Sequence, residues 1–304
     1  MSDIGPISNK NVGGIKKAPT ESSAKAKDNV TKADPNPSFK KTTESAESKI
    51  TKWFTQAGVS TSRYSKLDPD QNKKLDKREQ MKRIRRMENL ERILERALDF
   101  GVDKSSQENI DADWFFSFIG LAENVYSVGM QDIWGKIFAA EISKPGSFSV
   151  RTLKTLQEIT QREANVFQIA VSLAAKRKGE YSPKVLYGYY RKPSILALLR
   201  LPKTHQLNLA QFGLTYPDLL TLMDAGLIYS SEIESAEMAV NNVSEWQVNV
   251  RNLQITPKVS GLFLNYYKFT AIGAELSKLV NVVPNEPYID ALKKVLLEDF
   301  SVLE

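Results

Sequence analysis

The sequence contains no cysteine and a single histidine, His205. Without cysteine the chain cannot form a disulfide framework, a thiolate zinc site or a cysteine nucleophile. His205 lies in the run Pro-Lys-Thr-His-Gln, which is typical of a solvated loop. A zinc site would have to be built from carboxylates alone, which is unusual. We therefore predict no metal site and no cofactor.

The signatures of nucleotide binding and serine hydrolysis are also missing. There is no G-x-x-x-x-G-K-S/T or G-x-G-x-x-G loop to cradle phosphates, and no G-x-S-x-G elbow to present a serine. Asp111, Asp113, Glu123 and Glu141 could be combined into a Mg²⁺ nuclease cluster, but Asp111 stands where a helix N-cap belongs. Residues 68–72 resemble a calcium loop without its glycine and closing glutamate. The sequence favours a protein that is not an enzyme, with a metal-dependent nuclease as one alternative.

Long apolar runs are absent. No run approaches the roughly 20 residues that cross a bilayer, and the first residues lack the charged-then-apolar layout of a secretory signal. We therefore expect a cytoplasmic protein without a membrane span.

Positive charge is concentrated in the first hundred residues, although the formal net charge is only +6. Residues 1–50 hold nine lysines against six acidic residues, and residues 51–100 hold thirteen basic against eight acidic residues. The remainder holds 20 basic and 22 acidic residues. Residues 1–48 have few apolar side chains, so we expect a disordered tail. A basic arm on a nearly neutral body indicates a polyanionic partner such as nucleic acid.

A long helix is predicted over residues 72–99. Six apolar side chains recur at three- and four-residue steps and are expected to face inward, namely Met81, Ile84, Met87, Leu90, Leu94 and Ala97. The first half carries eight basic residues against two acidic ones, namely Lys73, Lys74, Lys77, Arg78, Lys82, Arg83, Arg85 and Arg86. These cations are candidates for sequence-independent phosphate contact. The alternatives are a solvated face held by Glu–Arg pairs and a helix lying on an anionic membrane surface.

A second basic and aromatic group follows at 176–192. Its candidate nucleic-acid contacts are Lys176, Arg177, Lys178, Tyr187, Tyr190, Arg191 and Lys192. Tyr181, Lys184 and Tyr189 lie between these positions in the sequence. Interleaved tyrosines and cations can stack bases and neutralise phosphate. The competing interpretation, which we favour, is that these tyrosines pack between domains.

Residues 133–153 contain the most distinctive motif, I-W-G-K-I-F-A-A-E-I followed by P-G-S-F-S and R-T-L. Trp134 and Phe138 are four residues apart and would share a buried face. Pro145 and Gly146 form a turn, and Ser149 is an expected cap. Glu141 is expected to bond Arg151 across the turn and so lock two helices together. A functional role for Glu141 is the alternative.

With the upstream Asp113-Trp114-Phe115 and Ala122-Glu123-Asn124-Val125, this motif resembles an uncharacterised bacterial domain-of-unknown-function family, DUF2806. More distantly, the layout is similar to the abortive-infection alpha proteins of phage defence. The resemblance covers about 105–280 and excludes the basic arm. It implies a bacterial or phage-related cytosolic protein and assigns no catalytic residue.

The C-terminal part, 180–304, is expected to be a winged-helix-like α+β module. A helix that begins after Thr215 precedes two strand-like runs and a closing helix. The candidate recognition helix, 216–225, has two Asp and no Lys or Arg, which argues against reading a DNA groove. The predicted fold is thus mainly α: a disordered tail (1–48), a linker and basic helix (49–104), a helical bundle (105–179) and this module.

These features together predict a non-enzymatic protein that associates with nucleic acid, through the basic helix, and with protein partners. A homo-oligomer is expected, and a role in phage defence follows only from the distant resemblance. The alternative is a regulatory or structural oligomer that binds an acidic protein.

Overall fold

The computed structural model describes residues 45–59, 71–101, 109–192, 204–248, 251–281 and 283–304. The chain divides into two units, 1–52 and 53–304. Helix α1 (Ala46–Gln56) buries none of its side chains. Residues 1–44 of the predicted disordered tail (1–48) lie outside the described residues. Its last three residues, 46–48, belong to α1, so the prediction of disorder is wrong for them. The calcium-loop-like run at 68–72 lies largely outside them too.

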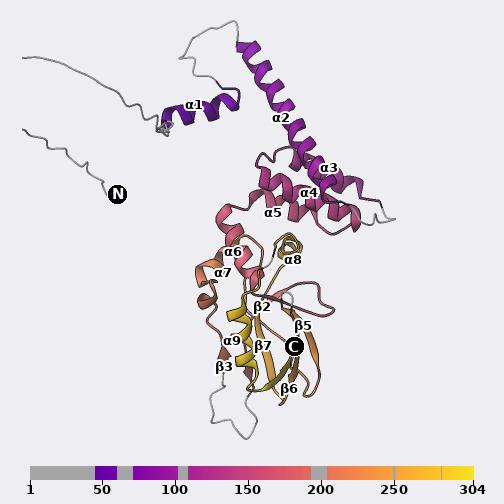
Figure 1. The fold of residues 1–304 in the computed structure, drawn as a ribbon, viewed down its shortest axis with the longest axis vertical. Coiled ribbons are helices and arrows are strands. Elements are labelled where there is room, and N and C mark those ends of the chain that lie inside the picture. Colours follow the sequence, from indigo (N-terminus) through magenta and orange to yellow (C-terminus); the bar gives the residue numbers. More distant parts are fainter. Residues whose placement is uncertain (1–44, 60–70, 102–108, 193–203, 249–250, 282) are drawn as a thin grey trace, which may run out of the picture. The chain divides into compact units, whose positions relative to one another are not determined.

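Five helices follow in the larger unit (Figure 1). They are α2 (Gln71–Asp99), α3 (Ala112–Ala122), α4 (Val128–Ser143), α5 (Val150–Glu158) and α6 (Gln161–Ser172). Their starts follow local capping chemistry. The Asp111 carboxylate accepts from the Trp114 N–H at 2.8 Å, the Ser149 side chain caps α5, and Thr160 and Glu163 form the capping box of α6.

Aromatic side chains fill the space between α3 and α4. Phe118 lies at the centre, with ring centroids 5.3 Å from Trp114, 5.2 Å from Trp134 and 5.2 Å from Phe138. Trp134 is fully buried and Phe138 partly buried against the same cluster. The buried face predicted for these two residues is confirmed.

The second half of the chain forms an eight-stranded antiparallel sheet in the order β4-β7-β2-β1-β5-β6-β8, with β3 paired to β2. The strands are β1 (Ala174–Arg177), β2 (Lys184–Arg191), β3 (Thr204–Gln206), β4 (Ile233–Glu234), β5 (Ser244–Val248), β6 (Arg251–Pro257), β7 (Leu262–Lys268) and β8 (Phe300–Leu303). The prediction of a mainly α fold is therefore wrong. The chain is a mixed α+β protein.

The prediction of a winged-helix-like module at 180–304 is also wrong, because its strands belong to the eight-stranded sheet. Helix α7 (Tyr216–Asp224) begins with a Thr215–Asp218 capping box, but the β5–β6 hairpin is no isolated wing, because β5 pairs with β1 and β6 with β8. Alternate residues of both strands are buried, Trp246 and Leu253 among them. A hairpin with one buried face needs a larger sheet and a second layer to cover it.

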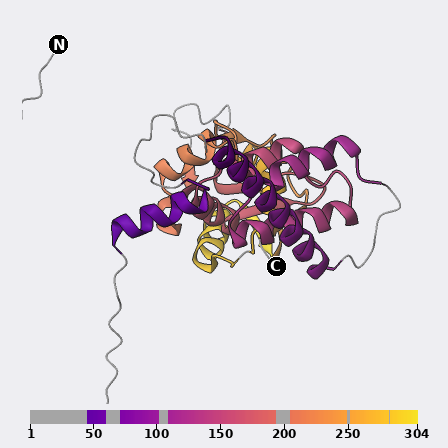
Figure 2. The ribbon, with the colours of Figure 1, turned by 90° about the horizontal axis from the view of Figure 1, so that it is seen from above.

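Two further helices complete this part, α8 (Ala271–Ser277) and α9 (Glu286–Leu296). The α9 residue Tyr288 is fully buried, and its hydroxyl donates to the Leu186 carbonyl of β2 at 2.7 Å. Helix α8 contacts α5, which joins the sheet to the preceding helices. In the view from above, α2 runs as one continuous helix across the other helices of its unit (Figure 2).

Candidate nucleic-acid interface

Helix α2 has an anchored half and an exposed half. Residues 72–80 are exposed at every position, and the first fully buried side chain of the helix is Asn89. Ile93 and Ala97 are buried behind it, where α2 packs against α4 and α3. The first half of α2 therefore extends beyond the elements that hold the second half.

Two ion pairs and a buried pair of amides anchor the second half of α2. The Asn89 amide donates to the Glu123 carbonyl at 2.9 Å and accepts from Gln131 of α4 at 3.2 Å. The Arg86 guanidinium pairs with the Glu123 carboxylate at 3.3 Å, and Arg96 pairs with Asp132 at 2.8 Å. Asn89 and Gln131 are both buried and bonded to each other, so a shift of α2 would leave a buried donor unsatisfied. These contacts fix the point beyond which α2 extends past α3 and α4.

The predicted inner face of α2 is only partly correct. Leu90 and Ala97 pack inward as expected, but Ile84, Met87 and Leu94 are exposed. The apolar pattern of α2 therefore describes two faces, one turned to α3 and α4 and one turned away from them.

The eight predicted cations of α2 do not all remain available. Lys77, Arg78, Lys82 and Arg83 are exposed, and Arg83 makes a long contact with Glu79, at 3.9 Å. Lys73 and Lys74 are exposed at the start of the helix, and Arg85 is half-buried. Arg86 is used in the anchor to Glu123. Six of the eight predicted cations are thus exposed on one short helical segment, and Arg85 and Arg86 are half-buried.

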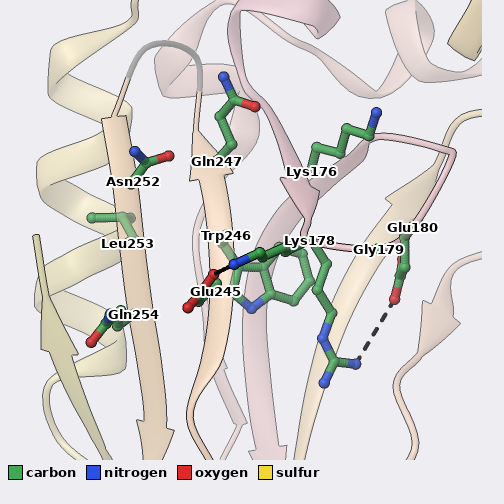
Figure 3. A pocket seen from close by; sticks show the side chains of 11 residues that line it. Lys176, Lys178, Gly179, Glu180, Glu245, Trp246, Gln247, Asn252, Leu253 and Gln254 are labelled. Atoms are coloured by element: carbon green, nitrogen blue, oxygen red, sulfur yellow. Dashed lines mark ion pairs between the residues drawn. The ribbon is translucent and has the colours of Figure 1, made fainter.

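Three cations of the second predicted group, Lys176, Arg177 and Lys178, line an open cavity of about 660 Å³ at the end of β1 (Figure 3). Arg177 lies 3.8 Å from the Glu180 carboxylate, and Lys178 lies 2.6 Å from Glu245. Glu245 raises the pKa of Lys178 by hydrogen bonding and by its charge. Lys176 shares the cavity with the amides of Gln247, Asn252 and Gln254. Two acids therefore neutralise much of this surface.

The tyrosines of this group pack within the sheet. The Tyr187 hydroxyl donates to Glu232 at 2.7 Å, and the Tyr189 hydroxyl donates to Asp299 at 3.2 Å. Burial, together with these carboxylates, raises both tyrosine pKa values. Tyr190 stacks on Phe263 with ring centroids 4.8 Å apart. These rings pack within the C-terminal part of the chain, and these contacts are not the packing between domains that we predict from the sequence.

The remaining cations of the group are scattered over β2 and its ends. The Lys184 ammonium is buried, lies 2.5 Å from Glu180 and sits over the Tyr266 ring, and burial lowers its pKa. Arg191 pairs with Asp299 at 3.6 Å. Lys192 is exposed at the end of β2. The structure does not join residues 176–192 into one basic surface.

Glu141 shapes the turn after α4. Its two carboxylate oxygens accept hydrogen bonds from the Gly146 N–H at 2.5 Å and the Phe148 N–H at 3.1 Å, and it is buried. Gly146 has a positive φ of 78° after Pro145, as a left-handed turn position requires. Arg151 is exposed, and among the described residues no ion pair joins it to Glu141. The lock expected between Glu141 and Arg151 is thus made by backbone N–H groups instead.

The acids weighed for a nuclease do not form a metal centre within the described residues. Asp111, Asp113 and Glu141 share the lining of a cavity of about 500 Å³ with Glu275, but no group of three or more acids or histidines among the described residues could hold a metal ion. Asp111 is the N-cap of α3. His205 stacks on Tyr189, with ring centroids 4.8 Å apart.

Two structural features escaped the sequence prediction. Glu275 of α8 reaches the start of α5, and Asn89 and Gln131 form the buried anchor of α2. All three are polar residues within helices. In the sequence alone, a buried polar residue of a helix cannot be distinguished from a solvent-exposed one.

The fold and the site define a class, a mixed α+β protein that carries an exposed basic helix. Residues 73–293 match the model of a family described as "Protein of unknown function (DUF2806)", and the chain belongs to this family. The match begins inside α2, so the basic helix falls within the family's domain, contrary to the narrower range expected from the motif. No curated protein and no solved structure matches the chain. Of the described helices, none has the length and apolarity to traverse a membrane.

Proposed function

We propose that this protein binds nucleic acid without sequence preference through the first half of α2. The observation that carries the proposal is that six cations of residues 73–83 are exposed on a helix whose residues 72–80 are exposed at every position, while its second half is anchored. Residues 73–86 hold eight basic and two acidic residues, a net charge of +6. A helix so charged repels itself, and phosphates that displace its counterions relieve this repulsion.

A polyphosphate suits this segment better than an acidic protein does. Specific protein interfaces usually have an apolar core, and residues 73–86 offer only Leu75, Met81 and Ile84 as large apolar side chains among eight cations. Few amides are present to read base edges, which favours backbone contact over sequence recognition. The proposed association with protein partners therefore falls to other surfaces. A role in phage defence rests on distant resemblance alone and stays a prediction.

The proposal is tested by fluorescence anisotropy with a labelled duplex and a labelled single strand of arbitrary sequence. The variant Arg78→Glu, Lys82→Glu, Arg85→Glu is expected to lose about tenfold or more in affinity. A matched control, Lys154→Glu, Arg162→Glu, Lys294→Glu, changes the net charge equally at exposed positions of α5, α6 and α9. Equal losses in both variants would show that net charge alone matters. Polyglutamate competing as well as nucleic acid would favour an acidic protein partner.

A further inference from the structure

Four large apolar side chains of α2 form an exposed stripe that no other described element covers. Their exposed fractions are 50% for Ile84, 60% for Met87, 54% for Leu94 and 72% for Leu98. The spacings of three, seven and four residues are those of alternating heptad positions, with Glu91 at the position between. This stripe, the α2 seam, is about 21 Å long. An isolated exposed leucine is ordinary, whereas a continuous heptad stripe is the pattern of a helix that pairs with another helix.

The charge of α2 changes sign along its length. After the basic first half, residues 87–99 hold four acidic residues against two basic ones. Glu88, Glu91 and Glu95 border or interrupt the α2 seam, whereas Arg96 is engaged by Asp132. One end of the helix is therefore complementary in charge to the other end of an identical helix.

We propose that α2 pairs in antiparallel orientation with α2 of a second copy of this chain. Antiparallel heptad layers place Ile84 against Met87 of the partner subunit. The same register lays the stem of Lys77 over Leu94 of the partner subunit, with its ammonium near Glu95 of the partner subunit. A parallel pair would instead align Glu91 with Glu91 of the partner subunit and basic halves with each other. Charge therefore selects the antiparallel orientation.

This pairing uses Lys77 but leaves the opposite side of the proposed nucleic-acid surface open. At about 100° per residue, Arg78, Lys82 and Arg85 lie on the side of α2 away from the seam. Each copy would then contribute one set of outward cations to a two-fold symmetric surface. The dimer does not depend on nucleic-acid binding, and either proposal can fail alone.

The absence of native cysteine makes a disulfide test clean. In the full chain, Met87→Cys lies next to the proposed two-fold axis and should form a disulfide-linked dimer under mild oxidation. Leu98→Cys is more exposed, but it would lie about 38 Å from its counterpart in the antiparallel pair. It should therefore not cross-link. Cross-linking of both variants would mean a parallel pair or random collision, and cross-linking of neither would mean no pairing; either result overturns the proposal.

A charge exchange tests the register independently. Lys77→Glu alone and Glu95→Lys alone should each weaken self-association in sedimentation equilibrium by several-fold, since each creates two like-charge contacts. The double variant should regain the wild-type dissociation constant, because the pairs are restored with reversed sign. A double variant as weak as the product of the two single variants overturns the register. Anisotropy with duplex, measured in parallel on the cross-linked Met87→Cys dimer, reports on the outward cations separately.

Discussion

The buried Glu275 carboxylate accepts a hydrogen bond from the Thr152 hydroxyl at 2.6 Å, across 123 residues of sequence. The same oxygen accepts from the Ser149 N–H at 2.7 Å. Because Ser149 also caps α5, one carboxylate of α8 fixes the first turn of a helix that packs with α3. The sheet and the helices that carry α2 are thereby joined through buried, charge-assisted hydrogen bonds.

Replacing Glu275 is expected to weaken this connection. Glu275→Gln should lower the free energy of unfolding by about 1.5–3 kcal/mol, because an amide oxygen can still accept both hydrogen bonds but without the charge that strengthens them. Urea denaturation of Glu275→Gln, Thr152→Val and the double variant gives the coupling between the two side chains. A coupling free energy of about 0.5 kcal/mol or more is expected. Simple additivity would contradict the contact.

Glu141 and Arg151 provide a matched pair of substitutions in the family motif. Glu141→Ala leaves the Gly146 and Phe148 N–H groups without their acceptor, so we expect a loss of about 2–4 kcal/mol. Arg151→Ala should change stability by less than about 0.5 kcal/mol. Thermal unfolding of both variants tests which partner Glu141 uses. A large loss of stability in Arg151→Ala would support the Glu141–Arg151 ion pair expected from the sequence.

Gly135 of α4 allows α2 to approach closely. A Cβ at this position would lie 2.6 Å from the Arg96 Cβ, so Gly135→Ala should push α2 away and cost about 1–3 kcal/mol. Gly129→Ala in the same helix has open space and should be neutral or stabilising by about 0.4–1 kcal/mol. Hydrogen exchange should show faster opening of residues 89–97 in the first variant only. Equal protection in both variants would argue against the close packing.

Alkaline pH is expected to destabilise the sheet. Burial and neighbouring carboxylates raise the pKa values of Tyr187, Tyr189 and Tyr267 above their ordinary value of 10.0. These hydroxyls stay protonated in the folded chain where the unfolded chain releases the proton, so their contribution is full below pH 10.0 and is lost as pH rises above it. Burial lowers the pKa values of Lys184 and Lys278, which acts in the opposite direction but involves fewer groups than the tyrosines.

Urea midpoints measured across this pH range check the prediction. The midpoint should fall steeply above about pH 10, and Tyr189→Phe should flatten the fall. Tyr216→Phe is the control, because Tyr216 is 67% exposed. A midpoint that stays level would show that these hydroxyls titrate normally.

Features set by local chemistry could be predicted from the sequence. The starts of α5 and α6 follow from the side chains of Ser149 and Thr160, which bond N–H groups within three residues. The buried face of Trp134 follows from its spacing to Phe138. Helix α2 is also predictable as an element, because its periodic pattern is long.

Features set by distant pairing could not be predicted. β1 has four residues, and Ala174 and Ala175 in it pair with Val185 and Lys184 of β2. So short a strand has no period of its own to detect. The hydrogen-bond partners of Glu141 could not be predicted either. The sequence offers the guanidinium of Arg151 as a partner, but it does not show that the turn brings the Gly146 and Phe148 N–H groups nearer. Periodicity alone also could not tell which apolar face of α2 packs against α4.

The salt dependence of nucleic-acid affinity tests the central claim most directly. For the full chain, the logarithm of the association constant should fall linearly with the logarithm of salt concentration, by about 0.9 for each phosphate neutralised. The variant Arg78→Glu, Lys82→Glu, Arg85→Glu should show a slope shallower by about 3. An unchanged slope, or affinity that does not respond to salt, would contradict binding through the exposed half of α2.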